Sequence, residues 1–238
     1  MLVFGNNRKT RSRRRLNTEV YRPPFSRIRR YRPRIENRWG NTQTPFSVIK
    51  KKFNRIFSAD DFLKQRAKAL HRLQVVVDWG CGNGETLRGI AKEYGSQIRP
   101  IGFASESFPE WEPPAKTHAV NEPVFIQGTA GDFPRIFKKN TVDLIYSHLG
   151  IQYLFRPFHP GRKNRVNVSR GVNSLKRIIP ALSTGGKIVF DCDWLAITTR
   201  NRRYAIKRQI EHALEGIATV EYDPVQVTFY ITKTPTTQ

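Results

Sequence analysis

From residue 75 onward, short apolar runs alternate with stretches in which apolar side chains recur every three or four residues. Short runs rich in Val, Ile and Phe predict buried strands, and the longer periodic stretches predict helices. The pattern predicts seven strands, at 75–78, 99–103, 123–127, 142–147, 186–191, 218–222 and 226–232. Between them it predicts helices at 85–94, 133–138, 170–182 and 203–216.

Strands that alternate with helices predict a parallel sheet, because a parallel connection needs a crossover and the helix provides it. The last two strands are separated by only a few residues around Asp223 and Pro224, so they must form an antiparallel hairpin. We therefore expect an α/β fold with a doubly wound, mostly parallel seven-stranded sheet and a C-terminal antiparallel hairpin.

The chain before the sheet divides into two segments. Residues 1–45 are rich in arginine and proline and poor in apolar side chains, which predicts a basic, extended arm. Residues 46–73 predict a helical lead-in, because Phe46, Ile49 and Phe53 recur near helical spacing. Within it, residues 58–61 offer an N-cap for a helix that runs to about Leu73. Residues 74–238 then form the α/β domain.

Positive charge is concentrated in the arm. The 238-residue chain has a formal net charge of +23, and residues 1–39 hold 13 Lys and Arg against two Glu. Arginine interleaved with aromatic side chains favours contact with the phosphates and bases of nucleic acid. We expect RNA contacts from the arm and from a basic loop after the fourth strand, at Arg11, Arg13, Arg14, Arg15, Arg29, Arg30, Tyr31, Arg32, Arg34, Arg156, Arg162, Lys163 and Arg165. A targeting segment is the alternative interpretation of the arm.

Composition narrows the setting further. No apolar run reaches the roughly 20 residues that a membrane-spanning helix needs, so we expect no membrane partner. The two cysteines, Cys81 and Cys192, have neither the spacing of metal ligands nor that of a disulfide framework. We expect no metal site and an intracellular, reducing compartment.

The stretch Asp78-Trp79-Gly80-Cys81-Gly82-Asn83-Gly84 joins the first strand to the first helix of the sheet. Glycine lacks a Cβ, so the backbone can take a positive φ and approach a ligand closely. Open α/β sheets bind nucleotides at such turns, outside the carboxyl ends of the strands. The Gly-Lys-Ser/Thr of a phosphate-binding loop is not present, and Gly82 and Gly84 are too close together for the dinucleotide fingerprint.

This strand–turn–helix unit resembles motif I of the class I S-adenosylmethionine-dependent methyltransferases, and the predicted element order extends the resemblance over roughly residues 70–235. The resemblance implies that the cofactor is S-adenosylmethionine, with the glycine loop around its methionine part and Asp78 as the acid that holds it. It also implies cofactor contacts from the ends of the second, third and fourth strands. The candidate cofactor-binding residues are Asp78, Gly80, Cys81, Gly82, Asn83, Gly84, Ser105, Glu106, Thr129, Ala130, Asp132 and Ser147.

Two positions depart from the pattern of that family. The family usually has one acid after the second strand, for the ribose hydroxyls, and another after the third strand, near the adenine amino group. Ala104 and Thr129 stand at these positions, and Glu106 and Asp132 follow closely as the expected substitutes. Each missing charge-assisted hydrogen bond costs about 1.5–3 kcal/mol of binding free energy.

His148, at the end of the fourth strand, is the candidate general base, since imidazole exchanges protons near neutral pH. The alternative is a histidine that merely packs at the rim of the cleft. Asp191 and Asp193, after the fifth strand, are expected to cap that strand. The expected function is S-adenosylmethionine-dependent methyl transfer to RNA or within a ribonucleoprotein. Two alternatives stay open: a non-catalytic, methyltransferase-like RNA-binding scaffold or assembly component, and a small-molecule or protein methyltransferase with a targeting arm.

Overall fold

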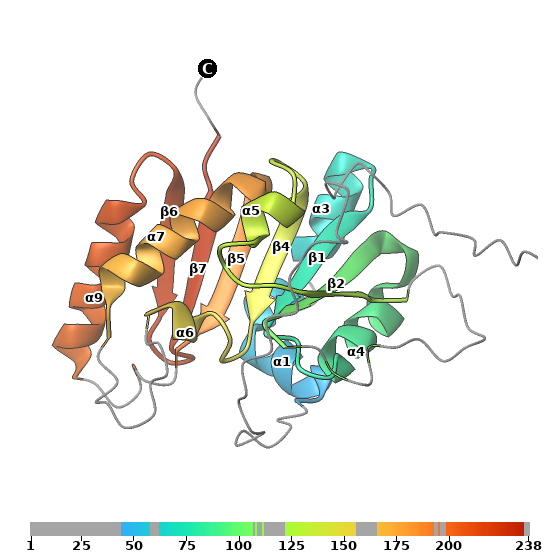
Figure 1. Cartoon of the computed structure of the whole chain (residues 1–238), viewed down its shortest axis with the longest axis horizontal. Helices are drawn as coiled ribbons and strands as arrows, with labels where there is room; N and C mark the ends of the chain where they lie inside the picture. Colours follow the sequence, from blue (N-terminus) through green and yellow to red (C-terminus); the bar gives the residue numbers. More distant parts are fainter. Residues whose placement is uncertain are drawn as a thin grey trace, which may run out of the picture.

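The computed structural model describes residues 44–57, 62–106, 108, 111, 122–155, 166–192, 195 and 199–235. Its centre is a seven-stranded sheet with the order β3-β2-β1-β4-β5-β7-β6 (Figure 1). The parallel strands are β1 (Gln74–Trp79), β2 (Ile98–Ala104), β3 (Val124–Gln127), β4 (Val142–Ser147) and β5 (Leu182–Asp191). β7 (Thr228–Lys233) is antiparallel both to β5 and to β6 (Ala218–Asp223). The predicted doubly wound sheet with a C-terminal hairpin is confirmed.

Helices cover both faces of the sheet. One face carries α5 (Phe133–Ile136), α6 (Gln152–Phe155), α7 (Val168–Ile178), the 3-10 turn η4 (Ile179–Ala181) and α9 (Arg200–Ala213). The other carries α1 (Phe46–Lys52), α2 (Asn54–Phe57), α3 (Phe62–Leu70) and α4 (Glu85–Tyr94), which is followed by the 3-10 turn η2 (Gly95–Gln97). In Figure 1, α7 passes in front of the strands, and α1 and α6 lie near the same end of the sheet.

The side chains of β1 divide between the two cores, as the alternation of a strand requires. Val75, Val77 and Trp79 join the core under α7 and α9, whereas Val76 joins the core under α1 and α4. Tyr146 of β4 belongs to this second core. The alternation therefore turns Asp78, two residues after Val76, toward the face that α1 and α4 cover.

The boundary predicted between the helix at 170–182 and the strand at 186–191 is wrong. α7 ends at Ile178, and β5 begins at Leu182. The reason is an irregular register, in which Val142 pairs with Leu182 but Leu144 pairs with Lys187. The extra residues of β5 form a bulge, where Gly185 has a φ of +70°.

The segment before the sheet is helical where the structure describes it, in α1, α2 and α3. The helix predicted to reach Leu73 ends at Leu70, because His71 takes a left-handed conformation with a φ of +48°. The predicted N-cap at 58–61, residues 1–43 of the arm and the basic loop at 156–165 lie outside the described residues. None of the helices in the described part of the chain is long and apolar enough to cross a membrane.

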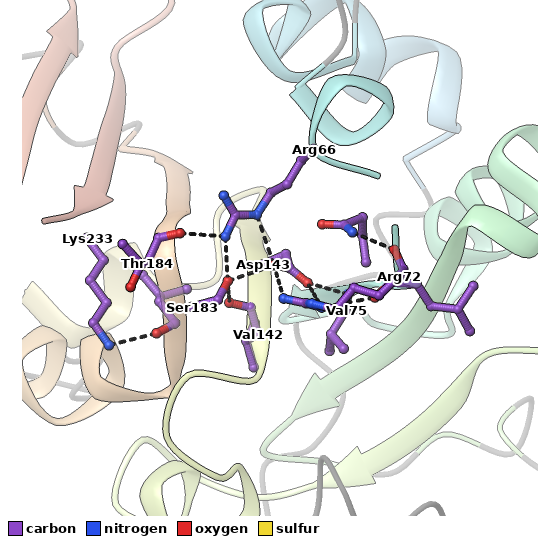
Figure 2. Close-up of polar contacts among 11 residues, drawn as sticks. Arg66, Arg72, Val75, Val142, Asp143, Ser183, Thr184 and Lys233 are labelled. Atoms are coloured by element: carbon purple, nitrogen blue, oxygen red, sulfur yellow. Dashed lines mark hydrogen bonds and ion pairs between the residues drawn. The ribbon is translucent and has the colours of Figure 1, made fainter. Parts of the chain in front are cut away.

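A buried carboxylate joins α3 to the amino end of the parallel strands. Asp143 of β4 is fully buried, and Figure 2 shows the donors that surround it. Its Oδ1 accepts hydrogen bonds from Arg66 Nε (2.9 Å), Arg72 Nη2 (2.8 Å) and Ser183 Oγ (2.6 Å). Its Oδ2 accepts from Arg72 Nη1 (2.8 Å) and from the backbone N–H of Val75 (2.9 Å). This network, which we call the Asp143 cluster, is saturated with donors.

Candidate functional site

The glycine loop lies at the opposite, carboxyl end of the parallel strands. Gly80, Gly82 and Gly84 have φ values of +84°, +52° and +87°, a region that side chains disfavour. A Cβ on Gly80 would stand 3.1 Å from the Cα of Gly150, and one on Gly84 would stand 2.4 Å from the ring of Phe125. A Cβ on Gly82 would meet nothing within 4 Å. Packing therefore requires Gly80 and Gly84, whereas Gly82 borders open space.

Hydrogen bonds to backbone and side chains hold the shape of this loop. The N–H of Gly84 donates to the carbonyl of Cys81 (2.8 Å), and the side-chain oxygen of Asn83 accepts from the N–H of Glu85 at the start of α4 (3.1 Å). Burial raises the pKa of the Cys81 thiol, and the neighbouring Asp78 raises it further. The loop therefore presents backbone and a neutral thiol.

Trp111 supports the glycine loop and was not predicted from the sequence. Its indole Nε1 donates to the carbonyl oxygen of Gly82 at 2.8 Å. Its ring stacks on Phe125, with 5.2 Å between the ring centroids. The sequence offers only a weak signal for this role, a tryptophan in a proline-rich loop.

Asp78 is a buried acid beside the glycine loop. Burial raises the pKa of its carboxyl to about 7, although interactions with Tyr146 and His148 lower it in part. The Tyr146 hydroxyl is buried without a hydrogen bond of regular geometry. Within the described residues, no lysine or arginine forms an ion pair with Asp78. A cation that binds beside this carboxyl would therefore interact favourably with its ionised form.

Ser147 ties the end of β4 to the end of β1. Its hydroxyl donates to the carbonyl of Trp79 (2.7 Å) and accepts from the N–H groups of Gly150 (3.1 Å) and Ile151 (2.8 Å). A hydroxyl has one hydrogen and two lone pairs, so all its hydrogen-bonding capacity is engaged within the chain. The cofactor contact expected of Ser147 stays a prediction, and the hydroxyl has no capacity left for it.

His148 meets Asp191 at the carboxyl ends of β4 and β5. Its Nδ1 lies 2.6 Å from Asp191 Oδ2, which also contacts Lys52 Nζ of α1 at 2.5 Å. Asp191 Oδ1 accepts from the N–H of Leu149 at 2.6 Å. Burial by itself would raise the pKa of Asp191, but His148, Lys52 and the Leu149 N–H outweigh it and the pKa is lowered. We call these residues the His148 cluster.

His148 was predicted from the sequence, whereas Asp191 was expected only to cap a strand. The missed signal is that β4 and β5 are neighbours, so residues just past their ends lie side by side. Lys52 carried no local signal, because its contact depends on how α1 packs over the sheet. Asp193 lies outside the described residues.

The residues predicted for the ribose and adenine lie at the ends of β2 and β3. Ser105 is exposed and its carbonyl accepts from the Gln127 side chain (3.1 Å), while Glu106 is partly buried. Asp132 Oδ2 accepts from the N–H (3.0 Å) and the hydroxyl (2.7 Å) of Thr129. The Asp132 carboxylate thus closes the turn before α5, around the partly buried Ala130. Its cofactor contact stays a prediction.

The structure therefore gathers Asp78, the glycine loop and the His148 cluster at one edge of the sheet. Within the described residues, no group of three His, Cys, Asp or Glu side chains is placed to hold a metal ion. The predicted RNA-contacting residues of the arm, and those between Arg156 and Arg165, lie outside the described part.

No protein-family model and no curated protein matches the sequence. Solved structures with a similar fold include the aminoglycoside resistance methyltransferase NpmB1, which is 14% identical with a TM-score of 0.47 over 71% of this chain and 92% of that one. The plantazolicin methyltransferase BpumL in complex with SAH is 14% identical, with a TM-score of 0.48 over 80% of this chain and 88% of that one.

A third similar structure is the 1,6-didemethyltoxoflavin-N1-methyltransferase of Burkholderia thailandensis, with bound S-adenosylhomocysteine. It is 18% identical, with a TM-score of 0.44 over 79% of this chain and 86% of that one. The strand order β3-β2-β1-β4-β5-β7-β6, with β7 antiparallel, identifies the fold directly. The chain has the fold of the class I S-adenosylmethionine-dependent methyltransferases.

Proposed function

We propose that the protein is an S-adenosylmethionine-dependent methyltransferase. The observation that carries the proposal is the pairing of an open glycine, Gly82, with a buried acid that has no cationic partner within the described residues, Asp78. When bound, the cofactor supplies a methyl group already activated on a sulfonium. The α-amino group of its methionine part is a cation, which suits Asp78, and the glycine loop leaves room for its backbone-like atoms.

The residues also fit the cofactor at its nucleoside end, though with fewer contacts. Ala104 and Thr129 cannot accept hydrogen bonds as carboxylates do. Glu106, partly buried just past β2, is the acid we propose for the ribose hydroxyls. Asp132 already accepts two hydrogen bonds from Thr129, so we assign it no ribose or adenine contact that requires its Oδ2. We therefore expect weak to moderate cofactor affinity.

We propose that the substrate is RNA, structured or within a ribonucleoprotein. The arm supports this through its charge, and two described segments add to it. Residues 44–57 hold four Lys and Arg without an acid, and residues 200–208 of α9 hold five without an acid. Both segments lie near the edge of the sheet that carries the site, since Lys52 reaches Asp191 and α9 begins shortly after β5. Polyanions bind to such surfaces through their phosphates.

A non-catalytic RNA-binding scaffold is the second candidate, because Ala104 and Thr129 remove the usual acceptors for the cofactor. For both candidate functions we propose an intracellular, reducing compartment, where the buried, free thiols of Cys81 and Cys192 remain reduced.

The test is transfer of a labelled methyl group from S-adenosylmethionine to total RNA by the full-length chain. We expect labelled RNA with the wild type and a large loss with Asp78→Asn. Cofactor binding without label in RNA, but with label in protein or small molecules, would overturn the RNA substrate. RNA binding without any cofactor binding at millimolar concentration would overturn the enzyme and leave the scaffold.

A further inference from the structure

We propose that Asp191 and Lys52 are positioning residues that hold His148 as a proton acceptor. The atom that this site methylates is then one that loses a proton in the reaction, either a hydroxyl oxygen or an N–H nitrogen. The inference rests on the proposed methyl transfer and deepens it. Neither residue was expected from the sequence to take part in the reaction, and the inference restricts which substrate atoms the site can methylate.

The geometry fixes which nitrogen of His148 carries hydrogen. Asp191 is almost fully buried, at 1% exposure, and its lowered pKa keeps it ionised at neutral pH. A carboxylate can only accept hydrogen bonds, so the contact of 2.6 Å to Nδ1 requires a hydrogen on Nδ1. The neutral imidazole then has its lone pair on Nε2, which is the proton-accepting atom.

Three elements hold this arrangement, which gives it rigidity. His148 follows β4, Asp191 ends β5 and Lys52 ends α1. The backbone N–H of Leu149 fills Oδ1 of the carboxylate, so that His148 and Lys52 share Oδ2. A buried carboxylate with three donors has no freedom to rotate away from the imidazole.

The charges around His148 oppose one another in a way that suits a base. The negative groups near His148 are Asp191, which contacts Nδ1, and Asp78, while Tyr146 beside Asp78 has a raised pKa and is neutral. The positive group is Lys52, whose ammonium shares Oδ2 of Asp191 with His148. Lys52 also offsets the cost of burying the Asp191 charge.

The substrate oxygen or nitrogen forms a bond to the methyl carbon, and the bond from that carbon to sulfur breaks with its electron pair left on sulfur. The proton of the substrate hydroxyl or N–H passes to Nε2 of His148, and solvent later takes it from the 23% exposed side chain. An atom without a proton would need no such acceptor.

Nitrogen NMR of the full-length chain labelled at histidine tests the arrangement without a substrate. His148→Asn identifies the His148 signals by their loss. We expect the wild type to carry hydrogen on Nδ1 and none on Nε2 above its titration midpoint. Asp191→Asn removes a negative neighbour and should lower that midpoint, whereas Lys52→Met removes a positive one and should raise it. Asp191→Glu should restore the wild-type pattern in part.

Lys50→Met is the matched control, because Lys50 stands on the same helix but contacts Glu93 (2.6 Å) instead. It should leave the His148 midpoint within a small fraction of a pH unit. Hydrogen on Nε2 in the wild type, or equal shifts in the Lys52 and Lys50 variants, would overturn the proposal. Once a substrate that the protein methylates is known, Asp191→Asn should also shift the acid limb of the plot of methylation rate against pH. An unchanged profile would overturn the role of Asp191 whatever the cofactor affinity, which separates this failure from failure of the proposed function.

Discussion

A buried aspartate lies at each end of the parallel sheet, and the two differ in whether cationic side chains pair with them. At the amino end, Asp143 accepts hydrogen bonds from two arginines, a hydroxyl and a backbone N–H. At the carboxyl end, Asp78 is also buried, but no lysine or arginine of the described residues pairs with it and its pKa is raised to about 7. The first carboxylate is fully paired within the chain, and the second has no cationic side chain of lysine or arginine beside it among the described residues.

The difference shows how burial can be used for stability or for function. A buried charge that is fully paired holds elements together, and breaking it is costly. A buried charge that lacks a partner lowers the stability of the free protein and adds binding free energy when a cation arrives. Asp191 lies between these cases, because one of its partners, His148, can itself gain or lose a proton.

Asp143→Ala should have the largest effect on folding. It leaves Arg66 and Arg72 without their common partner, and breaking a buried pair costs about 3–5 kcal/mol. Urea unfolding at neutral pH measures this loss of unfolding free energy. A loss below about 1 kcal/mol, the size expected of an exposed pair, would show that the cluster does not hold α3 to the sheet.

Asp78→Asn should stabilise the free protein at alkaline pH. The folded pKa of about 7 lies above the usual 3.8, so the wild-type unfolding free energy falls as pH rises from about 4 to about 7. At 1.36 kcal/mol per unit, the full difference amounts to about 4 kcal/mol. The variant should lack this decline while losing cofactor binding. If the unfolding free energies of wild type and variant change with pH in the same way between pH 5 and pH 8, the pKa of Asp78 is not raised in the folded protein.

Trp111→Phe should weaken the site without a large change in fold. The variant keeps a ring to stack on Phe125 but loses the hydrogen bond to the Gly82 carbonyl, which contributes about 1 kcal/mol. Cofactor affinity should fall several-fold, as measured by calorimetry. An unchanged affinity would mean that the loop keeps its shape without the indole.

Arg55→Gln should have the smallest effect. Arg55 pairs with Glu221, but their side chains are 48% and 52% exposed, and such pairs contribute about 0–1 kcal/mol. The difference in unfolding free energy between wild type and variant should decrease at high salt concentration. A loss as large as that of Asp143→Ala would show that exposure does not separate the two kinds of ion pair here.

Local pattern was enough to predict the sheet and the glycine loop. Strands and helices follow from periodicity, and the positive φ values of Gly80, Gly82 and Gly84 follow from residue type and spacing. The early start of β5 could not be predicted in this way, because it depends on a bulge set by pairing with β4. The same holds for Lys52, Asp191 and Trp111, since each acts through a contact with a residue far away in sequence.

The most direct test of the account is calorimetric titration of S-adenosylmethionine into Gly82→Ala and Gly95→Ala, alongside the wild type. Gly82 and Gly95 share a φ of +52°, and a Cβ on either meets nothing within 4 Å, so the added methyl group clashes with the chain in neither variant. Only Gly82 borders the proposed cofactor site. We expect binding by the wild type and by Gly95→Ala, and at least tenfold weaker binding by Gly82→Ala. Equal affinity in the two variants, or no binding by the wild type at millimolar cofactor, would contradict it.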